Sequence, residues 1–230
     1  MSPVLSIRDL RVEFDTPAGV VQAVRGVSLD VEPGELVGIV GESGSGKSVS
    51  FLSIMGLLPG TARVTGSATV AGTELIGVPA RQVRAQRGKK IAMIFQDPLS
   101  ALNPVHRIGT QIVEMIRAHQ DISQEAAHAR AVELLDLVGL PQPDVRATQY
   151  PHEFSGGMRQ RVMIAMAIAN DPEVLIADEP TTALDVTVQA QILEVIENVR
   201  RQLHTAVVFI TRWRIPPENS CGYCVARTSG

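Results

Sequence analysis

The sequence contains almost no cysteine. Its only two thiols, Cys221 and Cys224, lie close to the C-terminal end, so the first 220 residues contain none. Disulfides are rare in reducing compartments, and proteins there seldom depend on cysteine for stability. This distribution favours a protein whose body lies in the cytosol.

Long apolar runs are also missing. No window approaches the ~18 to 20 apolar residues that are needed to span a bilayer. The N-terminal segment "MSPVLSIRDLRVEF" lacks the basic stretch followed by an apolar core that is typical of a secretory signal. We therefore expect any membrane role to depend on a partner protein.

Charge of one sign is not gathered into long blocks. The formal net charge is −3. Sequence-independent binding to nucleic-acid phosphates needs clustered lysine and arginine residues. We expect no nucleic-acid partner.

What the sequence does contain is the pattern of a globular α/β protein. Its 230 residues are 45% hydrophobic, enough to bury a core. Continuous apolar runs at 35–41, 90–96, 173–179 and 205–211 predict strands buried on both faces of a parallel sheet. The first eighty residues alternate between apolar and polar, which predicts an antiparallel sheet, and helical patterns fill most of the middle.

This arrangement predicts one domain with an inserted helical part. Residues 1–97 and 171–211 form the expected α/β core, residues 98–170 form the expected helical subdomain, and residues 212–230 form a tail that fits neither.

A glycine-rich stretch, "GIVGESGSGKS", follows one apolar strand and precedes a helix. Gly41, Gly46, Lys47 and Ser48 match G-x-x-x-x-G-K-[ST] in the structural context that this motif requires. Backbone N–H groups of such a loop point at phosphate oxygens, and the helix N-terminus adds positive charge. We expect Lys47 to contact the β- and γ-phosphates and Ser48 to ligate Mg²⁺. The dinucleotide-binding pattern does not fit, because the glycine order differs and the expected acidic residue is missing.

The strand "EVLIADEP" ends in two carboxylates. Asp178 and Glu179 would lie at the C-terminal edge of the parallel sheet, beside the phosphates. We expect Asp178 to hold Mg²⁺ through water and Glu179 to act as the base that polarises the attacking water.

Two further stretches, "FSGGMRQRV" at 154–162 and "DEPTTALD" at 178–185, occur downstream of the loop and of "IFQDP". With these motifs in this order, the chain from about Val4 to Thr211 resembles the ATP-binding subunit of an ABC transporter. The resemblance implies a phosphate-loop ABC-cassette core, with a parallel sheet, an N-terminal antiparallel β subdomain and a helical subdomain that carries the signature.

The resemblance also implies roles for individual residues. Gln96 resembles the glutamine that reaches the metal and the attacking water, and Asp185 resembles the aspartate that meets the partner's phosphate loop. Phe14 occupies the position of the aromatic that stacks on adenine, although it could equally be a core phenylalanine. The ATP-binding set implied is Phe14, Gly41, Glu42, Ser43, Gly44, Ser45, Gly46, Lys47, Ser48, Ser155, Gly156, Gly157 and Asp185; the metal set is Ser48, Gln96 and Asp178.

Partners follow from the signature residues Ser155, Gly156 and Gly157. Two glycines and a serine at a helix start make an anion site, which in this family binds the γ-phosphate of ATP held by the opposite subunit. The resemblance therefore implies a head-to-tail homo- or heterodimer with ATP and Mg²⁺. The chain resembles most closely the importers of dipeptides, oligopeptides or nickel. In those importers, integral membrane permease subunits hold the ATPase at the cytoplasmic face of the membrane, and an extracytoplasmic binding protein delivers the cargo.

The end of the chain departs from the family pattern. Where the family has a histidine after the strand at 205–211, this sequence has Arg212, and arginine cannot replace a neutral imidazole acceptor. The resemblance implies that ATP binding and hydrolysis drive the import of peptides or nickel. One alternative is a truncated or frameshifted cassette, with residues 212–230 replaced or out of frame, that binds Mg·ATP but hydrolyses it poorly. We also expect the missing strands to leave a sheet edge uncovered. A soluble, non-transport ABC ATPase is the other alternative, although such proteins usually carry a coiled-coil insert or two fused cassettes.

Overall fold

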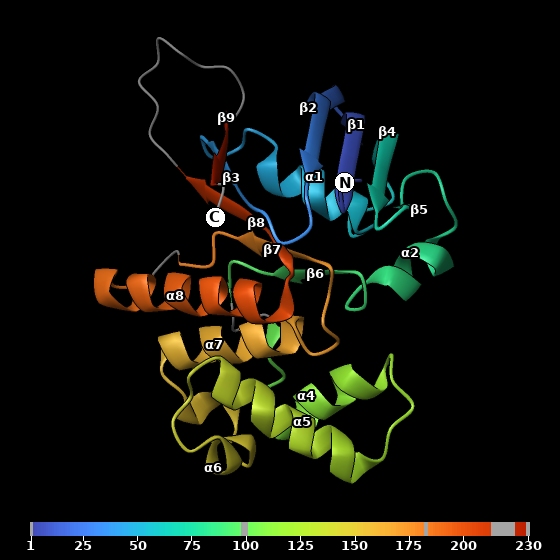
Figure 1. The fold of residues 1–230 in the computed structure, drawn as a ribbon. Coiled ribbons are helices and arrows are strands. Elements are labelled where there is room, and N and C mark those ends of the chain that lie inside the picture. Colours follow the sequence, from blue (N-terminus) through green and yellow to red (C-terminus); the bar gives the residue numbers. More distant parts are fainter. Residues whose placement is uncertain (1, 98–100, 182–183, 213–223, 229–230) are drawn as a thin grey trace.

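Two sheets organise the chain in the computed structural model, which describes residues 2–97, 101–181, 184–212 and 224–228 (Figure 1). The antiparallel sheet has the order β2-β1-β4-β5 and comprises β1 (Leu5–Thr16), β2 (Gly19–Val31), β4 (Ala62–Val70) and β5 (Thr73–Glu74). The larger sheet has the order β6-β7-β8-β3-β9 and comprises β3 (Leu36–Gly41), β6 (Ile91–Ile94), β7 (Val174–Asp178), β8 (Ala206–Arg212) and β9 (Cys224–Thr228).

The helices group on both sides of the larger sheet. They are α1 (Lys47–Ile54), α2 (Ala80–Gln86), α4 (Ile108–Arg117), α5 (Gln124–Leu137), α6 (Pro143–Ala147), the short 3₁₀ helix η1 (Pro151–Glu153), α7 (Gly156–Ala167) and α8 (Val186–Leu203). Among the described residues, none of these helices combines the length and the apolar character that a membrane span requires.

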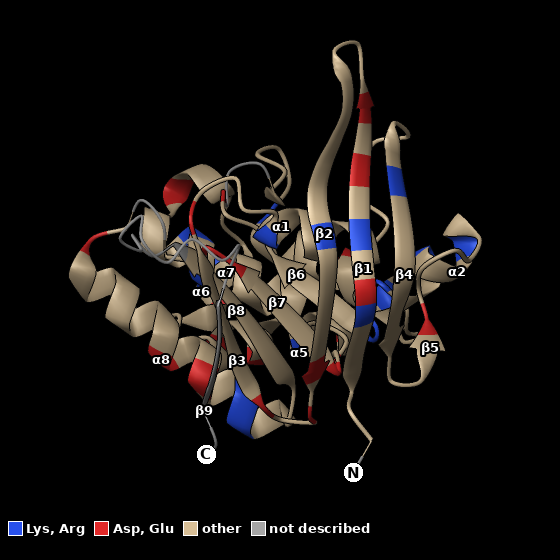
Figure 2. Ribbon diagram, turned by 90° about the horizontal axis from the view of Figure 1, so that it is seen from above, with Lys and Arg blue, Asp and Glu red and all other residues tan. Residues whose placement is uncertain are grey.

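The antiparallel sheet is buried on one face only. On β1, Leu5 and Ile7 are buried, and after a register shift Leu10 and Val12 continue the same face. A bulge inserts one residue, so the alternation changes from odd to even numbers without turning the apolar face outward. The opposite face carries charges of both signs, as Figure 2 shows along β1.

The parallel sheet is buried on both faces, as its continuous apolar strands predict. Alternate residues of β7 enter two different hydrophobic clusters: Leu175 and Ala177 pack with the helical side, and Val174 and Ile176 pack with α1 and the antiparallel sheet. The α/β fold with an antiparallel sheet and a helical part is confirmed by the structure and by similar solved structures reported below. The residue boundaries of the subdomains stay a prediction.

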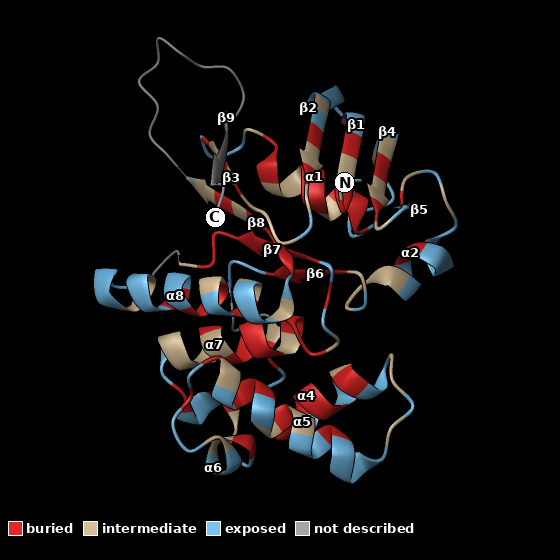
Figure 3. Ribbon diagram, viewed as in Figure 1, coloured by how far each residue is buried: buried red, intermediate tan, exposed pale blue. Residues whose placement is uncertain are grey.

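The helical side is centred on α7. Helices α4 and α5 contact α7, which in turn contacts α8. Figure 3 shows buried residues along α7 and exposed residues along much of α8. The helical side therefore connects the signature segment, at the start of α7, to the sheet through a continuous apolar core.

The expectation of an uncovered sheet edge is wrong. Residues Cys224–Thr228 form β9, which pairs antiparallel with β3 from Leu36 to Val40. Ladder hydrogen bonds come from the backbone, so an extended segment can cover a free edge without the side chains that are typical of the family. The tail thus contributes a strand beside the one that leads into the phosphate loop.

Candidate functional site

The phosphate loop connects β3 to α1. Helix α1 begins after Gly46, whose φ of 89° is left-handed, and Gly44 has a φ of 81°. A methyl group added at Gly46 would lie 2.4 Å from the carbonyl oxygen of Ala23 on β2. The loop therefore needs glycine at 46 for two reasons, the sign of φ and the close approach of β2.

Lys47 is directed back into its own loop. Its side chain is buried, and Nζ donates hydrogen bonds to the carbonyl oxygens of Gly41 (2.8 Å) and Glu42 (2.6 Å) and to Oγ of Ser45 (3.3 Å). A buried ammonium is costly unless such acceptors surround it. The loop thus holds a positive charge at the start of α1, where backbone N–H groups are also available to an anion.

Ser48 and Asp178 meet across the site. The hydroxyl of Ser48 donates to Oδ1 of Asp178 at 2.8 Å, although the two residues are 130 positions apart in the sequence. Because β7 is parallel to its neighbours, its carboxyl end delivers Asp178 to the edge where the loop lies. Two adjacent oxygen ligands are the donor type that Mg²⁺ prefers.

Glu179 and Gln96 form a second contact at the same edge. Nε2 of Gln96 donates to Oε2 of Glu179 at 3.3 Å, and the backbone N–H of Glu179 donates to the carbonyl of Ile210 on β8 at 3.0 Å. Glu179 has a φ of 48°, which is uncommon for a residue with a side chain. Strained backbone of this kind occurs preferentially where a side chain must be held in place for function.

The signature residues lie elsewhere, at the start of α7. Ser155 caps this helix by accepting a hydrogen bond from the N–H of Met158, and Gly156 and Gly157 form its first turn. Asp185 caps α8 in the same way, with Oδ1 accepting from the N–H of Val188 at 3.0 Å. The two helix starts are adjacent, because a methyl group added at Gly157 would lie 2.7 Å from Cγ1 of Val188.

A cavity of about 730 Å³ runs from β2 to the phosphate loop. Ala23, Val24 and Arg25 contribute to its wall, together with Gly44 and Ser45 of the loop. Phe14 is half-buried on β1, where it pairs with Val21 and Ala62, and it is not among the described lining residues. The cavity extends the phosphate loop toward the antiparallel sheet, where a nucleoside would continue from the phosphates.

Arg212 is the last residue of β8. In the parallel register it pairs with Gly41, the first glycine of the phosphate loop. The position at which the family has a histidine thus lies in the strand next to the loop.

Sequence motifs missed three features of this region. They did not reveal that the Ala23 carbonyl closes on Gly46, that β2 forms a wall of the cavity, or that Gln160 of α7 is buried. The first two depend on how the sheets pack, for which the sequence has no local signal. The position of Gln160 two residues before the apolar run "VMIAMA" of the same helix could have marked it.

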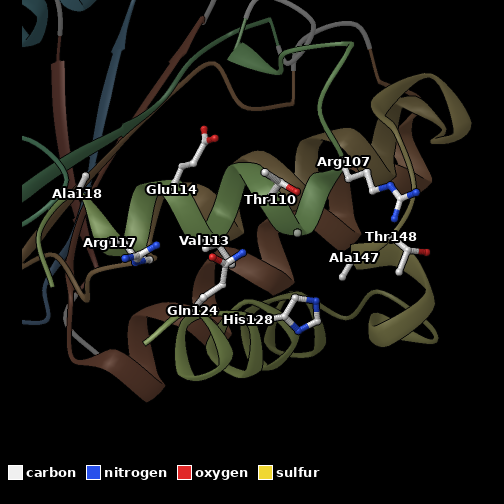
Figure 4. Close-up of a pocket in the computed structure, with 11 residues that line it drawn as sticks. Arg107, Thr110, Val113, Glu114, Arg117, Ala118, Gln124, His128, Ala147 and Thr148 are labelled. Atoms are coloured by element: carbon white, nitrogen blue, oxygen red, sulfur yellow. The ribbon is translucent and has the colours of Figure 1, made fainter. Parts of the chain in front are cut away.

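A second cavity, of about 580 Å³, lies between α4, α5 and α6 (Figure 4). Arg107 and Thr148 lie at one end and Arg117 and Gln124 at the other, with His128 between them. Its described lining comes entirely from the helical side, so it is separate from the phosphate loop.

Comparisons with known proteins show the family of this chain. The family model described as "ABC transporter" matches residues 24–182. The chain is 56% identical over 212 residues to an "Oligopeptide transport ATP-binding protein OppD" of Mycobacterium bovis, covering 92% of this chain and 35% of that protein. It is 52% identical over 213 residues to the "Dipeptide transport ATP-binding protein DppD" of Bacillus subtilis, covering 92% and 64%.

The solved structures lead to the same fold. A dimeric, post-hydrolysis structure of the ATP-binding cassette MJ0796 with ADP and Pi matches with a TM-score of 0.79 and 27% identity, covering 90% of this chain and 87% of that one. The present chain spans between about one third and two thirds of the length of the curated relatives it matches.

Proposed function

The chain belongs to the ABC transporter family, and we propose that it is the subunit that binds and hydrolyses ATP to drive the import of peptides. Relatives named as oligopeptide and dipeptide transport ATP-binding proteins are 50 to 56% identical over about nine tenths of the chain. Their names favour peptides over nickel as the cargo.

One observation carries the proposal of ATP hydrolysis. Two pairs of side chains, Ser48 with Asp178 and Gln96 with Glu179, meet at the strand edge beside the buried Lys47. The first pair offers metal ligands, the second offers a base with a polar neighbour, and the lysine offers positive charge. Phosphoryl transfer to water requires these three contributions in one place.

The roles follow from the chemistry. Lys47 would leave its loop carbonyls to contact the β- and γ-phosphates. Glu179 would accept the proton of the attacking water while Gln96 orients that water, and the bond between the γ-phosphorus and the bridging oxygen would break to give ADP and inorganic phosphate. Mg²⁺, held through Ser48 and Asp178 with Gln96 nearby, would neutralise phosphate charge.

A second chain completes the proposed site. Ser155 and Gly156 lie at the capped start of α7 and Asp185 caps α8, whereas helix α1, which follows the phosphate loop, packs with residues of both sheets. An anion site at the start of α7 is therefore available to an ATP held by another subunit. We propose a head-to-tail dimer, homomeric or heteromeric, with ATP at both interfaces.

Integral membrane permease subunits are the other proposed partners, with an extracytoplasmic binding protein acting only through them. Docking on the permease would place this chain at the cytoplasmic face of the membrane. The cavity between α4, α5 and α6 supports this placement, because it is concave, mixed in polarity and separate from the phosphate loop (Figure 4). Co-purification with two membrane subunits would support the proposal, and co-purification with nucleic acid instead would favour a non-transport ATPase.

The direct test measures phosphate release and ATP binding by the purified full-length chain. We expect Mg·ATP binding in the wild-type protein and in Glu179→Gln, with phosphate release lost in the variant. A chain in which Glu179→Gln releases phosphate as fast as the wild type would contradict the assignment of the base.

A second candidate function is suggested by Arg212. Its strand position beside Gly41 would give the γ-phosphate a fixed positive charge in place of a neutral imidazole. This variant of the proposal is a cassette that binds ATP and closes but turns over slowly. Comparing phosphate release by Arg212→His and by the wild type distinguishes a normal cassette from a slow one. Only in a slow cassette would the substitution raise the rate of ATP hydrolysis.

A further inference from the structure

Gln160 lies in α7, within one turn of the signature glycines. It is 1% exposed, and its amide nitrogen Nε2 has no hydrogen-bond partner in the part of the chain that the structure describes. A buried amide without a partner loses its hydration and gains nothing in return. Such groups are rare in folded proteins, and each one calls for an explanation.

The position of Gln160 on α7 shows which neighbour it faces. Gly156 and Gly157 precede it by four and three residues, so the three share one side of the helix. The two glycines face α8 and the segment before it. A methyl group added at Gly156 would lie 3.7 Å from Leu184, and one added at Gly157 would lie 2.7 Å from Val188. Gln160 is therefore on the side of α7 that carries the two glycines, and those glycines face Leu184 and Val188.

A second buried glutamine shows what a purely structural role looks like. Gln111 in α4 is 5% exposed, and all its polar groups are used. Nε2 donates to the carbonyls of Asn103 and His106, and Oε1 accepts from the N–H of Asn103. One buried glutamine is thus fully hydrogen-bonded, whereas the other has a donor without a partner within the described ranges of the chain.

The α7–α8 contact has the properties of an interface that can shift. Two glycines on α7 present no side chains to α8, so the helices can move against each other without repacking on that side. The carbonyl of Leu184 accepts a hydrogen bond from Gln189 at 3.0 Å, and a carbonyl oxygen has a second lone pair for another donor.

We propose that Gln160 is a positioning residue for the two-chain ATP site: when the signature engages ATP on the opposite subunit, α7 shifts against α8 and the Gln160 amide donates to the Leu184 carbonyl. This bond would hold Ser155 and Asp185, which cap the two helices, in a fixed relation. The inference rests on the proposed ATP-dependent dimer. In the single chain described by the structure, the Gln160 amide would have no partner. In the ATP-bound dimer, the same amide would donate to the Leu184 carbonyl.

The first arm of the test compares Gln160→Met with Gln111→Met in thermal unfolding of the full chain without nucleotide. Methionine matches the length of glutamine but has no amide. We expect Gln160→Met to leave the unfolding midpoint unchanged or to raise it by about 2 to 4 °C. Gln111→Met should lower the midpoint by a similar amount, because the part-buried backbone groups of Asn103 and His106 lose their hydrogen-bond partner. A midpoint that falls equally in both variants would overturn the inference.

The second arm measures dimer formation with Mg·ATP in the Glu179→Gln background, by analytical ultracentrifugation. We expect added Gln160→Met to weaken the ATP-dependent dimer about tenfold while ATP affinity of the monomer is unchanged. Equal dimer formation with and without Gln160→Met would overturn the inference alone. A Glu179→Gln chain that binds ATP but forms no dimer would overturn the proposed dimer, and the inference with it.

Discussion

The phosphate loop and the signature segment both begin a helix with glycine, yet they are stabilised in different ways. At the start of α1, the side chain of Lys47 binds its own loop, and Ser48 reaches Asp178 on β7. At the start of α7, the cap is Ser155 alone, and the contact to α8 is made by glycine surfaces. Ser155 and Gly156 are exposed, whereas Gly46 and Lys47 are buried.

This difference indicates which half of the proposed site is complete in one chain. The phosphate-loop side holds its charges and its strand-end carboxylates in hydrogen bonds before any partner arrives. The signature side offers exposed N–H groups next to a contact that can shift. We therefore expect variants of the first side to affect single chains and variants of the second to affect pairs.

The largest effect should come from the proposed base. We expect Glu179→Gln to reduce phosphate release by roughly 10²- to 10⁴-fold, because the attacking water loses its proton acceptor. ATP binding, measured by fluorescence titration, should be unchanged. Gln96→Ala is the companion variant, and it should reduce the rate less, because its amide orients the water without accepting the proton.

The next largest effect should come from the loop glycine. Gly46→Ala forces a methyl group to within 2.4 Å of the Ala23 carbonyl at a φ of 89°, so we expect a stability loss of more than about 2 kcal/mol and loss of ATP binding. Gly44→Ala is the matched control: its φ is 81°, but an added methyl meets nothing within 4 Å. We expect Gly44→Ala to lose about 1 kcal/mol of folding stability. If denaturant unfolding shows equal losses of stability in the two variants, the close approach of the Ala23 carbonyl does not add to the cost of a side chain at 46.

Arg212→His tests the slow-cassette alternative. If the arginine beside Gly41 limits turnover, we expect phosphate release to rise at least about tenfold, which corresponds to an activation barrier lowered by roughly 1.4 kcal/mol. Binding of ATP should change little. An unchanged rate in a single-turnover assay would show that the residue at this position does not limit hydrolysis.

A smaller effect is expected from the signature cap. Ser155→Ala removes the side chain that accepts from Met158, which should cost about 1 kcal/mol of stability. Ser155→Asp restores a cap but places negative charge where the γ-phosphate would bind. We expect it to recover stability in thermal unfolding and to prevent the ATP-dependent dimer, whereas a purely structural Ser155 would let the dimer form.

The smallest effect concerns α8 away from both sites. Hydrogen bonds from Arg200 lower the pKa of Glu197 to about 2, against the opposing effect of burial, with Arg201 adding to the lowering. Because the folded pKa is below the unfolded one, this carboxylate stabilises the fold above about pH 4.5 and loses that effect as pH falls toward 2. Glu197→Gln should cost about 1 kcal/mol at pH 7 and much less near pH 2, in urea unfolding at both pH values.

Much of the site could be predicted from the sequence, because its motifs are local. The run from Gly41 to Ser48 and the strand end at Asp178 and Glu179 each specify chemistry within a few residues. The confirmed family and fold follow from the order of these motifs. The subdomain boundaries and the roles of single residues stay predictions.

The sequence by itself determined that this chain has a phosphate loop, two strand-end carboxylates and a signature helix, because short-range spacing encodes them. Only the tertiary structure decided that β9 covers the edge of β3 and that the Ala23 carbonyl requires glycine at 46. It also decided that Gln160 is buried and that its amide nitrogen has no partner among the residues the structure describes. These features depend on backbone pairing and close packing between segments far apart in the chain, for which the sequence carries no local pattern.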